Sequence, residues 1–301
     1  MTISVVFAGS PAVALPYLRE LLAAGLDVVQ VITRPDSPQG RKKEISPTPV
    51  AVFASEHGIP ILKTTKLSEA EVANCDIGLI VAFGAKVPAS LLDKPKHGWV
   101  NVHFSVLPKY RGAAPLQRSM LEGSQASGVS IFKLVEELDA GPLYKTFSKD
   151  FLPNETASEA LERFSLESAA LAVQTLIEIS STDLAPVEQS GTPSSAPKFA
   201  GEDGKIDWSA PGEAIDRLIR AVTDEPGAYS FVNEMKLKIL RARLSEPVDG
   251  NPGEIHLTKN SVIVSTGSGK SIELLEVQPS GKQVMSAVSW IRGLRETPRF
   301  K

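Results

Sequence analysis

Short apolar runs alternate with helical patterns along the first half of the chain. Each run is rich in Val and Ile and ends near Gly, Pro or Ser. Between the first two runs, Leu15, Leu18, Leu21 and Leu22 recur at the spacing of one helical face. The runs predict strands at residues 3–9, 27–34, 59–63, 76–84, 98–105 and 128–134.

This order of elements predicts the fold class. Strands that are apolar on both faces and are joined by helices form a parallel sheet covered on both sides. We therefore expect an α/β fold: a Rossmann-like, doubly wound, mainly parallel sheet. A long amphipathic helix at residues 155–180 is expected to close this domain.

The pattern changes near residue 182. Residues 182–200 are rich in Pro, Ser, Thr and Gly, which is typical of a linker. A helix is predicted at residues 212–222 and another at 286–295, and short strands between them indicate a smaller C-terminal OB-like β-barrel domain. The expected organisation is a catalytic domain at 1–183, a linker at 184–204 and the barrel at 205–301. Its predicted strands are residues 228–232, 236–244, 253–257, 261–266 and 271–278.

Composition narrows the class of protein. The 301 residues carry a formal charge of −3, so the chain as a whole does not attract nucleic acid, and binding would need local basic patches. A single cysteine, Cys75, excludes an intrachain disulfide framework. The longest uncharged apolar run, residues 77–85, is less than half the roughly 20 residues of a membrane span. We expect a cytoplasmic protein without a membrane segment.

The turn after the first predicted strand argues against one cofactor class. It reads Ala8-Gly9-Ser10-Pro11 and contains one glycine, whereas the dinucleotide fingerprint GxGxxG has three. A nicotinamide cofactor is therefore not expected. The turn is interpreted as a sharp strand-to-helix connection.

Three polar residues in the fifth predicted strand mark the candidate site. Asn101, His103 and Ser105 alternate, so their side chains project to the same face. They lie at the carboxyl end of the strand, where open α/β sheets bind ligands. A histidine at a strand end is often structural, but three polar side chains facing a covered sheet are costly unless they bind something.

A carboxylate partner for His103 is predicted at the next strand exit. Asp139 precedes a turn after the sixth strand and is placed to hydrogen-bond His103, orienting the ring and keeping its pKa near or above the ordinary value. Asp-x-Gly-Pro is also a common turn, so both interpretations stand at this point.

These residue types suit acyl transfer to an amine. The attacking amine loses a proton, and His103 is the candidate base. The carbonyl oxygen gains charge in the transition state, and the Asn101 amide is a neutral donor for it. The sequence contains no Gly-x-Ser-x-Gly motif, so a covalent serine route is not favoured, and Ser105 is interpreted as a ligand-binding residue.

Basic residues gather in two places. Residues 34–50 contain four prolines and the cations Arg34, Arg41, Lys42 and Lys43, which suit phosphate contacts or a solvated loop. In the second domain, Lys236, Lys238, Arg241 and Arg243 are predicted to share one strand face. Together they favour nucleic-acid binding.

The sequence resembles the folate-dependent formyltransferases, and within them the methionyl-tRNA formyltransferase family. The matches follow the family order across almost the whole chain. The matching segments are Phe7-Ala8-Gly9-Ser10-Pro11, residues 34–50, Val81-Ala82-Phe83-Gly84, residues 101–117, Gly128-Val129-Ser130-Ile131, Leu138-Asp139-Ala140-Gly141, Ile206-Asp207-Trp208-Ser209 and residues 281–287.

The resemblance implies formyl transfer from 10-formyltetrahydrofolate to the amino group of methionyl initiator tRNA, in translation initiation and without a metal. It implies a C-terminal domain that adds tRNA contacts, and we expect a monomer. The implied site residues are the catalytic trio Asn101, His103 and Asp139, the folate-contacting Ser105, Val106, Leu107 and Pro108, and the tRNA-binding Arg41, Lys42 and Lys43.

Two departures and two alternatives accompany this resemblance. Phe104 stands where the family usually has a small residue, and it either packs away from the site or narrows it. Val106 replaces the usual leucine.

Formyl transfer to a small amine, such as a nucleotide sugar or a ribonucleotide, uses the same core residues, but it needs neither the basic loop nor a second domain. A non-catalytic RNA-binding protein is opposed by the complete set of Asn101, His103 and Asp139.

Overall fold

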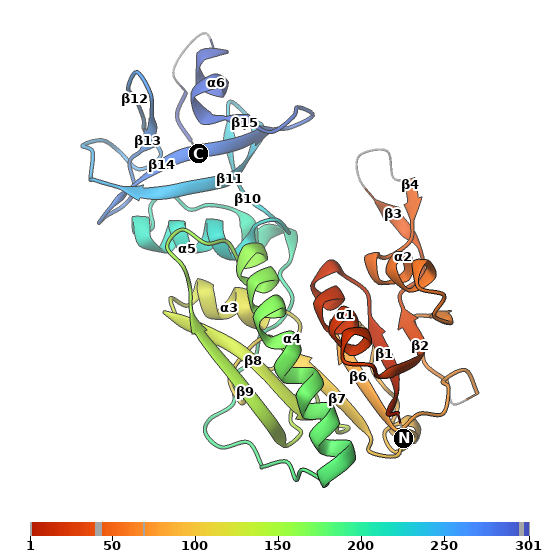
Figure 1. Ribbon diagram of the computed structural model, residues 1–301. Coiled ribbons are helices and arrows are strands. Elements are labelled where there is room, and N and C mark those ends of the chain that lie inside the picture. The colour runs from red at the N-terminus through yellow and green to blue at the C-terminus, as the bar shows by residue number, and fades with distance from the viewer. Residues whose placement is uncertain (1, 40–43, 69, 295–297, 301) are drawn as a thin grey trace. The chain divides into compact units, whose positions relative to one another are not determined.

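The computed structural model describes residues 2–39, 44–68, 70–294 and 298–300. The chain forms two compact units, and each carries its own sheet (Figure 1). The first unit comprises Met1–Pro115, Ser127–Lys149 and Leu161–Pro197, and the second comprises Leu116–Ala126, Asp150–Ala160 and Lys198–Lys301.

The first unit is built on a seven-stranded, mainly parallel sheet, which confirms the predicted class. The strand order is β5-β2-β1-β6-β7-β8-β9. The first five of these strands pair in parallel, and β8 then runs antiparallel to β7. The strands are β1 (Ser4–Gly9), β2 (Asp27–Thr33), β5 (Ile61–Lys63), β6 (Ile77–Val81), β7 (Trp99–His103), β8 (Ala126–Lys133) and β9 (Leu143–Asp150).

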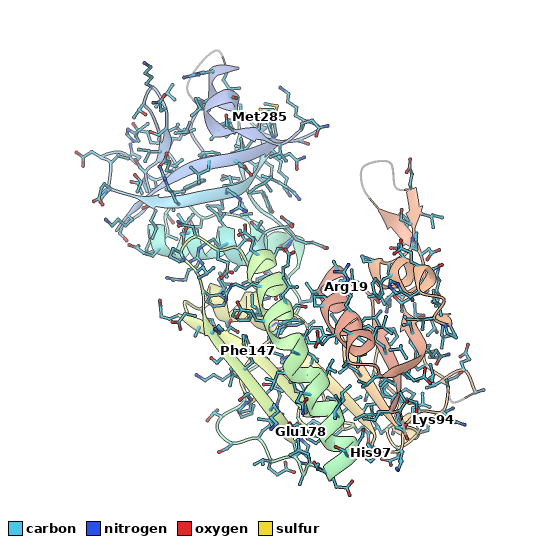
Figure 2. The ribbon with its side chains drawn as sticks, viewed as in Figure 1. Arg19, Lys94, His97, Phe147, Glu178 and Met285 are labelled. Atoms are coloured by element: carbon cyan, nitrogen blue, oxygen red, sulfur yellow. The ribbon has the colours of Figure 1, made fainter. Side chains whose placement is uncertain are left out.

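Helix α4 (Ala157–Thr182) is the long amphipathic helix expected from the sequence, and it packs along the β9 side of the sheet (Figure 1). Phe147 of β9 meets Phe164 of α4 edge-on, with ring centroids 5.9 Å apart. Glu178 of α4 pairs with Lys145 at 3.2 Å, and Figure 2 labels both Phe147 and Glu178. The other helices of this unit are η1 (Ala12–Ala14), α1 (Leu15–Ala23), α2 (Pro49–Glu56) and η2 (Ala89–Leu91).

Strand β9 is the one strand of this sheet that the sequence pattern did not predict. Its residues are LYKTFSKD; four of them are exposed, the other four are partly buried, and none is fully buried. A strand at the end of a sheet needs no continuous apolar run, since only one edge and one face are covered. The apolar pattern therefore identified the other six strands of the sheet and missed this edge strand.

In the core beside β7, the side chain of Trp99 packs directly against the backbone of β6. Trp99 is fully buried and its Nε1 donates to the Leu91 carbonyl oxygen at 2.8 Å. Its ring lies directly over Gly78 of β6, where a Cβ atom would stand 2.2 Å from the Trp99 ring. The apolar residues of this core are Val6, Ala8, Ile32, Leu67, Val72, Ile80, Phe83, Val87, Leu91 and Trp99.

Replacing Gly78 by alanine is expected to lower the free energy of unfolding of the first unit by about 1–3 kcal/mol or more, the usual cost of overpacking. The indole cannot retreat without losing its hydrogen bond to Leu91. Urea denaturation followed by circular dichroism measures the change. Gly201→Ala is the control, because its added methyl group meets no atom within 4 Å. Equal stability of the two variants would contradict the packing described here.

The second unit is an antiparallel sheet with flanking helices. Its strand order is β10-β11-β14-β13-β12, and β15 pairs with β14. All five predicted strands and both predicted helices of this region are present. The elements are α3 (Pro115–Leu121), η3 (Gly201–Gly204), α5 (Gly212–Val222), β10 (Ala228–Val232), β11 (Met235–Ser245), β12 (Ile255–Leu257), β13 (Val262–Val264), β14 (Ser271–Pro279), β15 (Met285–Ser286) and α6 (Ala287–Arg292).

The two edges of this sheet are joined by residues near the end of the chain. Phe300 forms a bridge with Val232 of β10, and its N–H donates to the Gly253 carbonyl at 2.9 Å. Arg299 forms a bridge with Glu254, next to β12. Phe300 stacks on Trp208 with centroids 4.8 Å apart. These bridges link the first and last strands, as an OB-like barrel requires.

The segment predicted as a linker is more ordered than its composition indicated. Through Pro197 it belongs to the first compact unit. Val187 exchanges backbone hydrogen bonds with Leu143, and Arg111 bridges with Ser195. None of the helices in the described ranges is both long and apolar enough to cross a bilayer.

Candidate active site

Strand β7 places two of the predicted site residues on one face of the sheet. Asn101 and His103 are separated by one residue, so their side chains project the same way. Asn101 is partly exposed, whereas His103 is 6 % exposed. His103 ends the strand and lies at the carboxyl edge of the parallel strands, where doubly wound sheets bind ligands.

The His103 ring is held by the backbone of the following loop. Its Nε2 lies 2.8 Å from the Tyr110 carbonyl oxygen. Because a carbonyl oxygen only accepts, Nε2 carries the hydrogen and donates it. Phe132 of β8 packs edge-on against the ring at 6.5 Å between centroids. A neutral His103 therefore keeps its lone pair on Nδ1, which is the nitrogen able to take a proton.

Asp139 lies on the Nδ1 side of His103. Its Oδ2 is 3.7 Å from Nδ1, and the same oxygen accepts the Gly112 N–H at 2.8 Å. The structure thus brings the two predicted residues together, but 3.7 Å is longer than a hydrogen bond. The expectation that Asp139 orients the ring through a hydrogen bond is therefore corrected, since the Tyr110 carbonyl oxygen does so.

Burial sets the direction of the His103 pKa. Removal from water lowers this pKa below its ordinary value, and the Asp139 charge and the Tyr110 hydrogen bond oppose that effect only in part. The sequence-based expectation that Asp139 keeps the pKa near or above the ordinary value was wrong, because it ignored desolvation. A lowered pKa leaves His103 neutral at pH 7, which is the form a general base requires.

The loop after β7 offers one apolar side chain to a ligand. Val106 is 40 % exposed, whereas Leu107 is buried and so is Pro108. Ser105 is fully buried and donates its hydroxyl to the Lys109 carbonyl oxygen at 2.7 Å. The hydrogen of the Ser105 hydroxyl is therefore used inside the loop, which leaves only its lone pairs for a ligand. Phe104 is also buried, which favours the packing interpretation for this residue.

The proline-rich basic segment is not the structureless loop that its composition indicated. Its described residues include β3 (Ser37–Gln39) and β4 (Glu44–Ser46), which pair antiparallel, and α2 begins at Pro49. Thr48 caps α2 through its hydroxyl, which also lies 2.6 Å from that of Thr33. Arg41, Lys42 and Lys43 fall between the two strands and lie outside the described residues.

The basic residues of β11 do share one face, and a β-bulge makes this possible. The register with β14 shifts between Ile239 and Arg241. Without that shift the even-numbered lysines and odd-numbered arginines would point to opposite faces. Leu237, Ile239 and Ala242 accordingly point inward and are buried.

Part of this basic charge is already paired. Arg241 forms an ion pair with Glu159 and lowers the pKa of that carboxyl group to about 2. Arg243 pairs with Glu273 at 2.7 Å. Lys236 lies over the Tyr229 ring at 3.5 Å, an arrangement that keeps its charge at the surface.

Sequence reasoning gave no role to several residues around His103 and Asp139. Tyr110 and Gly112 were visible only as parts of the Pro-Lys-Tyr-Arg-Gly run. Gln189 and Ser194 sit in the Pro-, Ser- and Thr-rich stretch, where no periodicity marks them. Within the described residues, no cluster of three or more His, Cys, Asp or Glu is arranged to hold a metal ion.

Solved structures with the same fold include an N-formyltransferase and a protein with bound tetrahydrofolic acid. An N-formyltransferase from Helicobacter canadensis, in complex with folinic acid and dTDP-3-aminofucose, has a TM-score of 0.70 at 20 % identity, covering 93 % of this chain and all of its own. HypX from Aquifex aeolicus in complex with tetrahydrofolic acid has a TM-score of 0.67 at 18 % identity and covers 97 % of this chain and 47 % of its own. At these identities the likeness establishes the fold alone.

Sequence relatives are much closer. Residues 1–176 match the formyl transferase family and residues 198–295 match the formyl transferase C-terminal domain. The methionyl-tRNA formyltransferase of Arthrobacter sp. (strain FB24) is 45 % identical over 96 % of both chains, and that of Paenarthrobacter aurescens (strain TC1) is 44 % identical over 98 % of both. The chain therefore belongs to the methionyl-tRNA formyltransferase family of formyl-transferring enzymes.

Proposed function

We propose that this enzyme transfers the formyl group of 10-formyltetrahydrofolate to the amino group of methionyl initiator tRNA. The observation that carries the proposal is the buried His103, whose Nδ1 lone pair faces Asp139 at the carboxyl edge of the sheet. The relatives at 44–45 % identity support the choice of acceptor, since they are named methionyl-tRNA formyltransferases.

His103 acts as the general base in this proposal. As the methionine amine attacks the formyl carbon, Nδ1 takes the proton that the amine loses. The imidazolium that forms is stabilised by the Asp139 carboxylate, now an opposite charge 3.7 Å away in a buried site. Nε2 stays hydrogen-bonded to the Tyr110 carbonyl oxygen throughout, so the ring does not turn.

Asn101 stabilises the developing charge on the formyl oxygen. Its carboxamide N–H groups are neutral donors on the same face of β7 as His103, and such donors act at the atom where negative charge grows. His103 then returns its proton to the leaving nitrogen of the folate. The formyl carbon thereby exchanges its bond to that nitrogen for a bond to the methionine nitrogen.

The loop after β7 is the proposed folate contact. Val106 presents an exposed apolar side chain three residues after His103, and Leu107 and Pro108 are buried residues of the same loop. Ser105 contributes by fixing the loop through Lys109. The co-substrate supplies the formyl group when bound.

The N-terminal domain is the proposed site of catalysis, and the C-terminal domain is the proposed site of tRNA binding. We propose residues 1–183 as the catalytic domain, 184–204 as the connection and 205–301 as the tRNA-binding domain. Arg41, Lys42 and Lys43 are the proposed tRNA contacts of the catalytic domain. One chain supplies every group in the mechanism, so a monomer suffices, and the tRNA substrate places the reaction in the cytoplasm.

A single assay tests the proposal. The enzyme is mixed with 10-formyltetrahydrofolate and methionyl initiator tRNA, with uncharged initiator tRNA as the control. We expect formylmethionine only with charged tRNA. We also expect KM for tRNA to rise about 10³-fold or more between about 50 and 200 mM salt, if roughly six or more phosphate contacts are made. Folate binding without product, or an acceptor KM indifferent to salt, would point instead to a small amine as acceptor.

A further inference from the structure

Residues 187–196, here called the strap, are hydrogen-bonded to the loop that follows His103 and to the turn that carries Asp139. Val187 exchanges both backbone hydrogen bonds with Leu143, at 2.7 and 2.8 Å. Near the other end, the Arg111 N–H donates to the Ser194 carbonyl at 2.8 Å, and the Ala196 N–H donates to the Arg111 carbonyl at 2.7 Å. The strap is therefore fixed to the first unit at both ends.

Ser194 holds the residue whose carbonyl oxygen fixes His103. The Ser194 hydroxyl accepts the Tyr110 N–H at 2.9 Å, and the Tyr110 carbonyl oxygen lies 2.8 Å from Nε2 of His103. Tyr110 has a φ of +64°, a conformation that a bulky side chain rarely adopts and that surrounding contacts must impose. The bond from Ser194 is one of those contacts.

Gln189 holds the turn that carries Asp139. Its Nε2 donates to the carbonyl oxygens of Asp139 and Gly141, both at 2.8 Å. Its Oε1 accepts from Nη2 of Arg111 at 2.8 Å, and Nη1 of the same arginine pairs with Glu137 at 3.1 Å. The carboxamide of Gln189 thus joins the turn that carries Asp139 to Arg111 in the loop after β7.

We propose that the strap positions the catalytic pair, with Ser194 setting the Tyr110 carbonyl that orients His103 and Gln189 setting the turn that carries Asp139. Neither residue touches the reacting atoms, so both are positioning residues. This inference rests on the proposed function, because it takes His103 and Asp139 as the catalytic pair.

The geometry makes the pair sensitive to such positioning. His103 and Asp139 are 3.7 Å apart and both are buried, so a small shift of either loop changes the charge interaction between them. A misplacement of about 1 Å in an active site can cost about 10²-fold in rate. Among the described residues, Asp139 is the ionisable group whose charge acts on the His103 ring.

Two variants test the two halves of the proposal. Ser194→Ala removes the acceptor for the Tyr110 N–H, and Gln189→Met keeps the length of the side chain but removes its hydrogen bonds. Ser194→Thr keeps the hydroxyl and serves as the rescue. Ser190→Ala is the matched control, because Ser190 is an exposed serine on the same strap. Formyl transfer to methionyl initiator tRNA is measured across pH, and the folded fraction is measured by circular dichroism.

We expect kcat to fall about 10- to 100-fold in Ser194→Ala and Gln189→Met, with KM for tRNA within about threefold of the wild type. We also expect the acid limb of the kcat profile to move about half to one pH unit lower. Both the Tyr110 hydrogen bond and the Asp139 charge raise the His103 pKa, so weakening either lowers it. Ser194→Thr and Ser190→Ala are expected to match the wild type.

Two results would overturn the role of the strap: wild-type kcat and pH profile in both variants, or a loss of activity that merely follows the folded fraction with the acid limb unmoved. His103→Ala, run alongside, separates this failure from failure of the proposed function. Full activity of His103→Ala would overturn the catalytic assignment itself. An inactive His103→Ala beside fully active strap variants would overturn the strap alone.

Discussion

Replacing His103 by alanine is expected to lower kcat about 10²- to 10⁴-fold, the usual contribution of a general base. The variant loses the Nδ1 atom that takes the amine proton, while the proposed folate-contacting and tRNA-contacting residues are unchanged. KM for tRNA is therefore expected to change little. Single-turnover formyl transfer with saturating methionyl initiator tRNA measures the chemical step directly.

His97→Ala is the matched control for this variant. His97 precedes β7 and His103 ends it, so the two histidines lie at opposite ends of the same strand, and Figure 2 labels His97. The control is expected to keep its rate. If His103→Ala keeps the wild-type single-turnover rate, His103 is not the base and the proposed mechanism fails.

Asp139→Asn is expected to lower kcat by about 10²-fold or more and to shift the pH profile. The carboxylate stabilises the imidazolium that forms during the reaction, and the amide carries no charge to do so. The Asp139 charge also raises the His103 pKa against the effect of burial. Its removal lowers that pKa, so the neutral base persists to lower pH and the acid limb moves toward lower pH.

The pH dependence of kcat/KM across about pH 4–8 measures both effects. In the wild type, activity falls as the pH drops through the His103 pKa, which lies below the ordinary histidine value. Glu136→Gln is the control, because Glu136 is an exposed carboxylate three residues before Asp139. An acid limb that stays in place or rises in Asp139→Asn would contradict the electrostatic role assigned to Asp139.

The rate loss and the limb shift answer different questions. A variant that merely disturbs folding loses rate without changing the pKa of the remaining active enzyme. A variant that removes a charge beside His103 changes both the rate and the pKa.

Asparagine is a milder structural change at position 139 than alanine. The Gly112 N–H donates to the same Asp139 oxygen that faces His103, and the asparagine side chain keeps an oxygen that can accept this hydrogen bond.

Much of the first sheet was predictable because burial leaves a local trace in the sequence. Strands β1 and β6 are covered on both faces, so nearly every residue in them is apolar, and the runs stand out in the sequence. The two-residue alternation of Asn101 and His103 is equally local, and it placed both on one face. β9 was not predicted from the sequence, because it contains polar and exposed residues and no continuous apolar run.

The basic segments were predictable in composition but not in structure. Proline content indicated a loop at residues 34–50, yet β3 and β4 pair within this segment. Helix α2 then begins at Pro49, because the Thr48 hydroxyl caps its N-terminus. On β11, the shared face of lysines and arginines depends on a bulge that no sequence periodicity marks. Which of these cations pair with acids depends on residues such as Glu159, 82 positions away in the chain.

By itself the sequence determined the fold class, the family and the identity of Asn101, His103 and Asp139 as candidates, because residue type, alternation and strand position are properties of short segments. Only the tertiary structure decided that the Tyr110 carbonyl orients His103, that burial lowers the His103 pKa, and that the strap holds both loops. Those features join residues as far apart as Tyr110 and Ser194, 84 positions along the chain, and exclude water from them together. Contact between distant segments and loss of solvent arise only when the whole chain folds, so no local pattern encodes them.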